Sequence, residues 1–179
     1  MSARDWVSFP CFTQEQVKEI NKEINKINTI DEDPSSAASN VIKSGTFVEV
    51  HCDPLMKFIY PFIYQCQLSN RMHFGHDIFW QFHIEGLMYN VYGINDEYGW
   101  HIDKSDVGEY DMKLTCLLNL SEEPYEGGEL FLINDQKNPT EFSSGMGLVF
   151  NSMIAHKVTP VTKGKRISLT YWAIGPNWK

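Results

Sequence analysis

The first part of the chain carries an apolar pattern with the period of an α-helix. Four aliphatic residues recur three or four positions apart: Val17, Ile20, Ile24 and Ile27. Residues with this spacing lie on one face of a helix. Thr13, followed three residues later by Gln16, has the sequence of a capping box at a helix N-terminus. We therefore predict an amphipathic helix over residues 14–28 that lies on a sheet.

A second helix is predicted to begin at Asp53 and Pro54, because aspartate is a good N-cap and proline suits the first helical position. Pro61 should kink or end this helix, since proline removes a backbone hydrogen bond. Residues 31–39, between the two helices, are expected to form a polar loop. The part of the chain up to about residue 70 is therefore predicted to be mainly helical.

After Asn70 the pattern changes to short stretches rich in aromatic and aliphatic residues, separated by Gly, Asn, Asp or Pro. The predicted strands span residues 84–94, 100–103, 114–120, 128–133, 140–143, 147–150, 156–161 and 166–174. About eight short strands suit a double-stranded β-helix, a jelly-roll or cupin-like barrel whose mouth holds a small ligand. We predict one mainly β domain over residues 1–179, with the β-helix core at about 74–175 and the N-terminal helices packed on it.

Two histidines and an aspartate are the candidate metal ligands. His101 and Asp103 are separated by one residue, so both side chains leave the same face of an extended strand. His156 begins another apolar stretch and is the candidate third ligand. Two imidazoles and a carboxylate leave three octahedral positions open, as in non-haem Fe(II) oxygenases, although the same ligands also suit zinc. His73 and His76 lack a third ligand nearby and are expected to be surface or hydrogen-bonding residues.

The last predicted strand supplies a candidate carboxylate site. Polar-capable and apolar residues alternate from Lys165 to Trp172, which places four side chains on one face: Arg166, Ser168, Thr170 and Trp172. A guanidinium binds a carboxylate through two parallel hydrogen bonds, and Ser168 offers a third donor. This face therefore predicts a site for the distal end of a dicarboxylic keto acid whose other end chelates the metal.

Three motifs between about Met88 and Trp172 extend this interpretation. They are a Tyr-Gly pair that leads into the His-x-Asp motif (residues 92–103), the sequence Glu-Gly-Gly-Glu-Leu (126–130), and the segment from the last histidine to the arginine (156–166). With these motifs the chain resembles the Fe(II)/2-oxoglutarate-dependent dioxygenases, and in particular their prolyl 4-hydroxylase-like branch. The resemblance covers nearly half of the chain.

The resemblance implies a role for each matching residue. His101, Asp103 and His156 would hold Fe(II), and Arg166 would bind the distal carboxylate of 2-oxoglutarate. Tyr92 would hydrogen-bond 2-oxoglutarate from a neighbouring strand. Two further residues would line the same pocket, namely Thr170 and Trp172. Dioxygen is the implied second cosubstrate, and ascorbate is an optional cofactor.

Composition and charge limit the partners and the cellular compartment that we expect for the protein. The formal net charge of −8 argues against a nucleic-acid partner, because phosphate binding relies on clustered Lys and Arg. The four cysteines, at positions 11, 52, 66 and 116, form no CxxC pair and favour free thiols in a reducing cytoplasm. The N-terminus lacks an apolar signal core, and the most hydrophobic run, residues 55–66, is too short to span a bilayer. We expect a soluble, cytoplasmic protein without a membrane partner; its oligomeric state is left open.

The functional hypothesis is hydroxylation of an unactivated C–H bond, coupled to conversion of 2-oxoglutarate and dioxygen into succinate and carbon dioxide. The resemblance favours a prolyl residue in a peptide or protein as the substrate. Two alternatives stay open. One is an oxygenase that acts on a small molecule or free amino acid, and the other is a catalytically silent metal-binding jelly roll that recognises a ligand.

Overall fold

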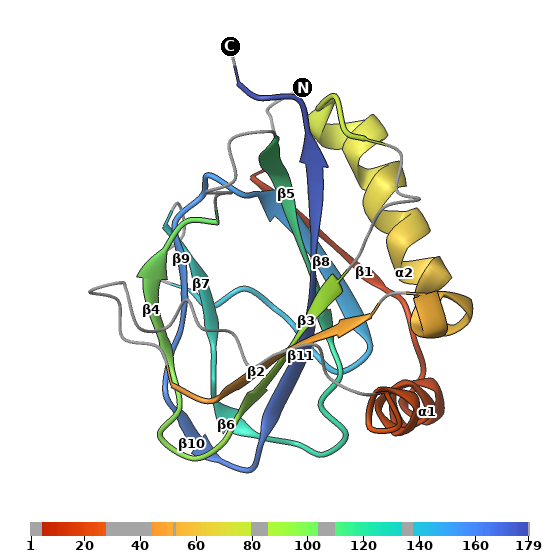
Figure 1. The fold of residues 1–179 in the computed structure, drawn as a ribbon. Coiled ribbons are helices and arrows are strands. Elements are labelled where there is room, and N and C mark those ends of the chain that lie inside the picture. The colour runs from red at the N-terminus through yellow and green to blue at the C-terminus, as the bar shows by residue number, and fades with distance from the viewer. Residues whose placement is uncertain are drawn as a thin grey trace.

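Two facing β-sheets form the body of the protein, and two helices cover the outer face of the larger sheet (Figure 1). The structure is a computed structural model that describes residues 5–27, 44–51, 53–79, 86–103, 110–133 and 138–178. The predicted loop at residues 31–39 lies outside these ranges, as does Cys52. The double-stranded β-helix predicted from the strand pattern is confirmed.

The larger sheet has six strands in the order β1-β8-β5-β11-β3-β2, and every pairing in it is antiparallel. Their bounds are Trp6–Pro10 (β1), Met146–Asn151 (β8), Asp111–Asn119 (β5), Arg166–Gly175 (β11), Gly86–Tyr92 (β3) and Thr46–His51 (β2). The smaller sheet contains Tyr98–His101 (β4), His156–Val158 (β9) and Leu130–Leu132 (β7), in the order β4-β9-β7. Val161–Lys163 (β10) pairs with Glu126–Gly127 (β6).

Alternation along the central strands divides the interior into two apolar layers. In β5, Leu114, Cys116 and Leu118 pack in the layer between the larger sheet and the helices. Leu117 points the other way, into the layer between the two sheets, with Leu148 of β8. This is the period-two pattern of a strand buried on both faces. The side of β5 and β11 that faces the smaller sheet is therefore the interior of the barrel.

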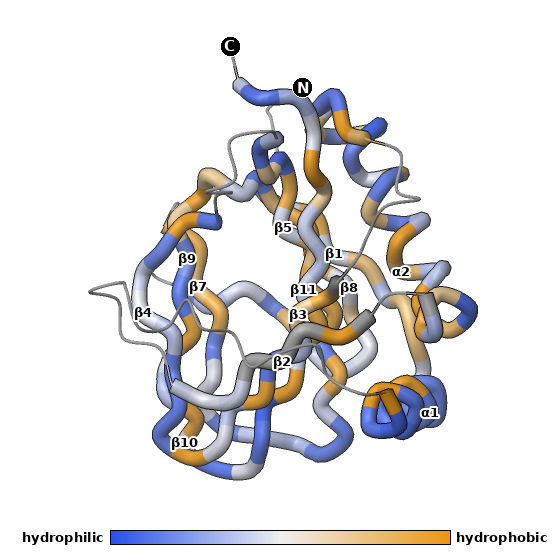
Figure 2. Tube along the Cα trace, viewed as in Figure 1, coloured by the Kyte–Doolittle hydropathy of each residue, from blue (hydrophilic) through white to orange (hydrophobic). Residues whose placement is uncertain are grey.

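Helix α1 (Gln14–Ile24) confirms the predicted amphipathic helix, although it ends before the predicted residue 28. Both hydrogen bonds of the capping box between Thr13 and Gln16 are present. Figure 2 shows the hydrophobic and hydrophilic residues of α1 on opposite sides of the helix. Buried Asn21 donates to the Leu120 carbonyl at 2.8 Å, which ties the helix to the chain leaving β5.

Helix α2 (Met56–Ser69) begins after a short 3-10 turn at Asp53–Leu55, and Leu55 rather than Asp53 is its N-cap. The helix does not end at Pro61 and continues into a π-helical turn at Asn70–Phe74. An interior proline costs about 3 kcal/mol. Burial of Ile59, Phe62 and Ile63 offsets this cost, because each such side chain contributes roughly 1.5–3 kcal/mol.

Some predicted strands differ from the structure. Residues 140–143 are not a strand, because Asn119 binds the Phe142 carbonyl and the Phe142 ring turns into the barrel. The stretch 156–161 is divided between β9 and β10 at Pro160, which lacks the N–H that a continuing ladder needs. Strands β1, β2 and β6 were not predicted. Among the described residues, no helix has the length and apolar character needed to cross a membrane.

The capping box at α1 gives a stability prediction. Thr13→Ala removes the side-chain acceptor for the Gln16 N–H, so the free energy of unfolding should fall by about 1 kcal/mol. Thr13→Ser keeps the hydroxyl and should stay close to wild type. Urea unfolding followed by circular dichroism measures both. An alanine variant as stable as wild type would show that the cap contributes nothing.

Candidate active site

Strand pairing brings the two candidate histidines together. His101 ends β4 and His156 begins β9, and the two residues are direct partners in the antiparallel ladder. Asp103 lies just past the end of β4, rather than on the strand as predicted. The ligand atoms of His101, Asp103 and His156 all lie within 4.8 Å of one another. Among the described residues this is the group of histidine, cysteine and acidic side chains close enough to share a metal ion, and His73 and His76 do not belong to it.

Both imidazoles are oriented by the same local contact. His101 Nδ1 lies 2.8 Å from the Gly99 carbonyl, and His156 Nδ1 lies 3.0 Å from the Ile154 carbonyl. Because a carbonyl only accepts, Nδ1 carries the proton in each ring and Nε2 is left as the donor of a lone pair. The Nε2 atoms point to Asp103, at 3.6 Å from Oδ1 for His101 and 3.7 Å from Oδ2 for His156. This is the tautomer that binds a metal through Nε2.

An aromatic ring packs against each of the two imidazoles. Tyr98 stacks on His101 with ring centroids 3.7 Å apart and planes 9° from parallel. Phe150, on β8, meets the His156 ring edge-on at 4.8 Å. Tyr98 lies inside the motif of residues 92–103 but was given no role of its own, and Phe150 was not singled out, because an aromatic residue in a strand is ordinarily a core residue. Only the packing of the two sheets shows which ring each one supports.

Arg166 is buried in the barrel with an incomplete set of partners. It is 1% exposed, and its guanidinium carbon lies 5.1 Å from the centre of the Tyr92 ring and 5.5 Å from that of Phe142. Nη1 donates to Ser168 Oγ at 3.1 Å, whereas Nε has no hydrogen-bond partner in the described part of the chain. A buried unpaired donor is costly. The residues therefore fit a carboxylate, which would accept from this guanidinium.

The remaining predicted pocket residues lie on the same interior surface. Tyr92 is the ladder partner of Arg166, and burial raises the pKa of its phenol, so that its hydroxyl stays protonated. Thr170 Oγ1 accepts a hydrogen bond from Asn90 Nδ2 at 2.8 Å. The indole of Trp172 donates to Asp103 Oδ2 at 3.0 Å. The structure thus links the arginine end of β11 to the metal-ligand end through one strand face.

The Glu-Gly-Gly-Glu-Leu sequence is explained by close backbone packing. Gly127 and Gly128 both have positive φ angles. A Cβ on Gly127 would lie 2.2 Å from the Pro160 carbonyl oxygen, and one on Gly128 would lie 3.0 Å from Cδ of Arg166. Glycine is required where φ is positive and another backbone approaches this closely. The turn therefore lets the chain pass directly beside the buried arginine.

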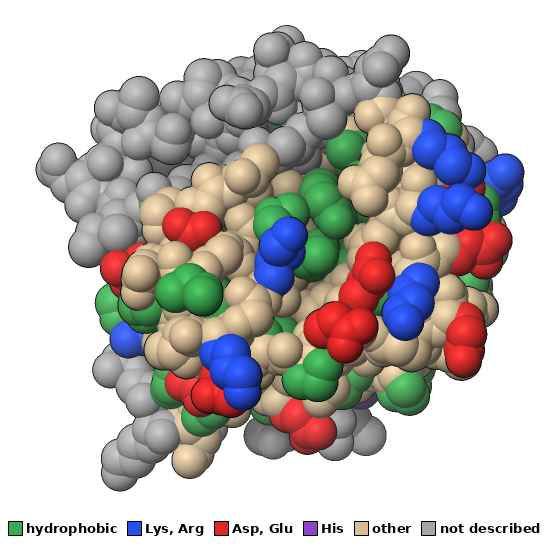
Figure 3. Space-filling view, turned by 90° about the horizontal axis from the view of Figure 1, so that it is seen from below, with side chains coloured by type: hydrophobic (Ala, Val, Ile, Leu, Met, Phe, Trp, Pro, Cys, Tyr) green, Lys and Arg blue, Asp and Glu red, His purple; other side chains and the backbone are tan. Residues whose placement is uncertain are grey.

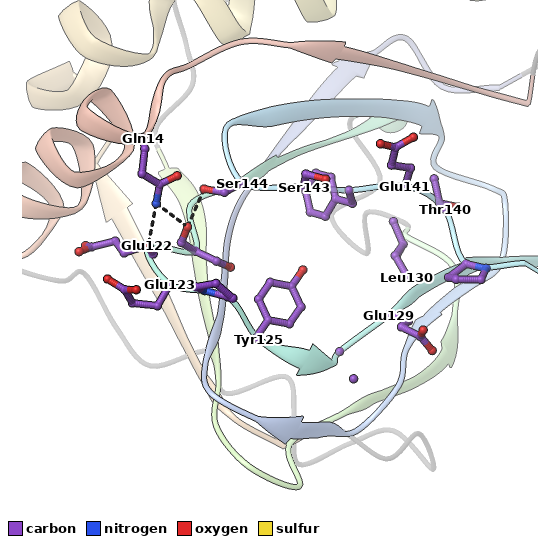
Figure 4. Close-up of a pocket in the computed structure, with 16 residues that line it drawn as sticks. Gln14, Glu122, Glu123, Tyr125, Glu129, Leu130, Thr140, Glu141, Ser143 and Ser144 are labelled. Atoms are coloured by element: carbon purple, nitrogen blue, oxygen red, sulfur yellow. Dashed lines mark hydrogen bonds between the residues drawn. The ribbon is translucent and has the colours of Figure 1, made fainter.

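A pocket of about 860 Å³ lies beside this turn, lined by residues 121–125, 127–130 and 139–144 together with Gln14 (Figure 4). Phe142 and Gly128 line it and also lie close to Arg166. Four glutamates line the pocket: Glu122, Glu123, Glu129 and Glu141. Figure 3, which views the molecule from below, shows acidic side chains interspersed with Lys and Arg. We assign this pocket no part in the site.

A double-stranded β-helix with two histidines and an aspartate at one end and a buried arginine inside is typical of non-haem iron oxygenases that use a 2-oxo acid. The model of the 2OG-Fe(II) oxygenase superfamily matches residues 87–174. The chain belongs to this superfamily, as its motifs indicated.

Known proteins resemble the chain to different extents. A PKHD-type hydroxylase of Alteromonas mediterranea is 37% identical over 95 residues, which cover 47% of this chain and 41% of that protein. One of Aliarcobacter butzleri is 28% identical over 169 residues, covering 89% and 74%. The chain spans about two fifths of the length of the first curated relatives it matches.

A solved structure shares the fold. The prolyl hydroxylase of Trichoplax adhaerens, in complex with a peptide fragment of the hypoxia inducible factor oxygen degradation domain, superposes with a TM-score of 0.72 at 15% identity, covering 94% of this chain and 83% of that one. At this identity the likeness establishes the fold.

The packing of Phe142 gives a second stability prediction. Phe142→Ala removes a buried ring from the layer between the sheets, so the free energy of unfolding should fall by about 3–5 kcal/mol. Phe142→Leu should lose less, because it keeps most of the apolar volume. Phe79→Ala, at an exposed phenylalanine, is the matched control and should change stability little. Equal urea midpoints for the two alanine variants would contradict the packing described for residue 142.

Proposed function

We propose that the protein is an Fe(II)- and 2-oxoglutarate-dependent dioxygenase that hydroxylates an unactivated C–H bond. The observation that carries the proposal is the combination of the histidine-aspartate-histidine cluster with a buried arginine on the same barrel interior. Zinc would use the same three ligands, but it would leave the incompletely partnered guanidinium without a purpose. Membership of the 2OG-Fe(II) oxygenase superfamily is a second argument for iron.

In this proposal His101, Asp103 and His156 hold Fe(II), and Arg166 binds the distal carboxylate of 2-oxoglutarate. When bound, iron and 2-oxoglutarate supply the oxidising chemistry that divides dioxygen between the substrate and succinate, with release of carbon dioxide. Ascorbate is an optional accessory cofactor in this proposal.

The chain's own residues orient and shield the reactants. Arg166 offers a fixed charge whose Nε points to no other acceptor in the described residues, and Ser168 holds Nη1 in place. Burial raises the pKa of the Tyr92 phenol, so its hydroxyl keeps its proton and can donate a hydrogen bond to 2-oxoglutarate beside the arginine. Thr170 and Trp172 line the path from the arginine to the metal ligands. The apolar layer between the sheets excludes water from this interior, which strengthens each of these polar interactions.

For the substrate we propose a prolyl residue in a peptide or protein. Support comes from the PKHD-type hydroxylases among the relatives and from the peptide-bound prolyl hydroxylase that shares the fold. The alternatives are a small-molecule or free-amino-acid oxygenase and a non-catalytic metal-binding module. Succinate formation separates an enzyme from a binding module, and a screen of proline-containing peptides against free amino acids separates the two enzymes.

We further propose that residues 1–179 act as one domain in the cytoplasm. The helical layer and the barrel share the larger sheet, which supports a single folding unit. Cys11, Cys66 and Cys116 are free thiols, which supports a reducing compartment.

The metal assignment predicts that His101→Ala, Asp103→Ala and His156→Ala each abolish stoichiometric Fe(II) binding and 2-oxoglutarate decarboxylation while the fold stays intact. Each change removes one of three ligands that the structure brings together. Anaerobic Fe(II) titration and succinate assays measure the two losses, and circular dichroism checks the fold. His73→Ala is the matched control, since His73 is exposed and outside the cluster. Full decarboxylation by any of the three variants would refute the assignment.

The arginine assignment predicts a selective loss of cosubstrate affinity. Charge-assisted hydrogen bonds contribute roughly 1.5–3 kcal/mol each, so Arg166→Ala should weaken 2-oxoglutarate binding at least about tenfold while Fe(II) still binds. Arg166→Lys keeps the charge but loses the planar fork, and should fall between the two. Anaerobic titration of the Fe(II) protein with 2-oxoglutarate, followed by the chelate absorption band, measures the affinity. Wild-type affinity in the alanine variant would mean that the carboxylate is bound elsewhere.

A further inference from the structure

The carboxylate of Asp103 is held on one side only. Thr115 Oγ1 donates to Oδ2 at 2.6 Å, and Trp172 Nε1 donates to the same oxygen at 3.0 Å. Thr115 belongs to β5 and Trp172 to β11, and the two are direct ladder partners. Within the described part of the chain, both hydrogen bonds to this carboxylate fall on Oδ2. Side chains from two central strands of the larger sheet therefore extend into the barrel and donate to the same oxygen of Asp103.

Ser152 extends this contact. Its hydroxyl lies 3.1 Å from Thr115 Oγ1. A threonine hydroxyl has one proton, and the carboxylate can only accept it, so Ser152 must be the donor to Thr115. The Ser152 carbonyl also accepts from the backbone N–H of Asp103 at 3.0 Å. Ser152 is fully buried, so both the backbone and the side chain of Asp103 are fixed from the end of β8.

The two hydrogen bonds decide which oxygen is left for a metal. A carboxylate oxygen has two lone pairs, and Oδ2 already accepts two donors. Both oxygens lie within the cluster of candidate ligands, Oδ1 at 3.6 Å from His101 Nε2 and Oδ2 at 3.7 Å from His156 Nε2. The two donors on Oδ2 are therefore what leaves Oδ1 for a metal. Three ligands leave three of six octahedral positions open. A bidentate aspartate would take one of these, and a chelating keto acid would then fill the last two and leave none for dioxygen.

We propose that Thr115, Ser152 and Trp172 are positioning residues that hold Asp103 so that only Oδ1 binds the metal. This inference rests on the proposed function, because it assumes that the cluster holds a metal. It also gives the Trp172 indole N–H a role at the metal ligand rather than at 2-oxoglutarate. Thr115 lies in the middle of β5 and Ser152 directly follows β8. Neither residue belongs to a sequence motif, and only their contacts with Asp103 in the folded structure disclose the role.

The test uses Co(II), whose visible absorption reports its coordination and which needs no turnover. Thr115→Val and Trp172→Phe keep most of the side-chain volume but lose one donor each. Loss of an outer hydrogen bond to a metal ligand typically weakens metal binding 10–100-fold, so each variant should bind Co(II) at least about tenfold more weakly with an altered absorption spectrum. Thr115→Ser restores the hydroxyl and should restore both the affinity and the spectrum.

Controls separate this inference from loss of fold and from the proposed function. Trp178→Phe changes an exposed tryptophan outside the cluster and should bind Co(II) as wild type does. Thermal unfolding without metal confirms that each variant is folded; should Thr115→Val fail to fold, Trp172→Phe decides. Wild-type affinity and spectrum in the folded donor-deleted variants would overturn the inference. If wild type itself binds no Co(II), or Asp103→Ala binds it equally well, the proposed function fails instead.

Discussion

The burial of Arg166 inside the barrel is the constraint on which the rest of the site depends. A guanidinium keeps its charge at neutral pH, and removing it from water costs several kcal/mol unless other groups replace the water. Here Ser168 accepts one N–H and the ring centres of Tyr92 and Phe142 lie 5.1 and 5.5 Å from the guanidinium carbon, while Nε lacks a partner among the described residues. The protein thus holds a positive charge that its own residues only partly compensate, and a bound carboxylate would complete the compensation.

Two apolar layers offset the free-energy cost of burying the polar and charged groups of the site. One layer joins the helices to the larger sheet, and the other joins the two sheets. The strands of the larger sheet are therefore packed on both faces, which suits a site whose groups must keep fixed positions. Polar side chains interrupt the inner layer where β5 and β11 face the smaller sheet, and each has a defined contact: Thr115 with Asp103, Asn90 with Thr170, and Asn119 with the Phe142 carbonyl.

Local patterns were sufficient for several features. The capping box and aliphatic period predicted α1, because both depend only on neighbours along the chain. Patterns failed where a distant contact decided the outcome. Pro61 did not end α2 because the side chains around it are buried against the sheet. Residues 140–143 did not form a strand because Asn119, more than twenty positions earlier, binds the Phe142 carbonyl.

The sequence by itself determined the chemistry that the chain carries: the His-x-Asp pair, the later histidine, the arginine strand and the glycine turn that allows close approach. These features are local, since each depends on residue type and short spacing. Only the tertiary structure decided how they meet. The register of β4 against β9 sets His101 opposite His156, and the pairing of β5 with β11 places Thr115 and Trp172 on one oxygen of Asp103. Register between distant strands follows from the packing of whole sheet faces, which a linear pattern does not encode.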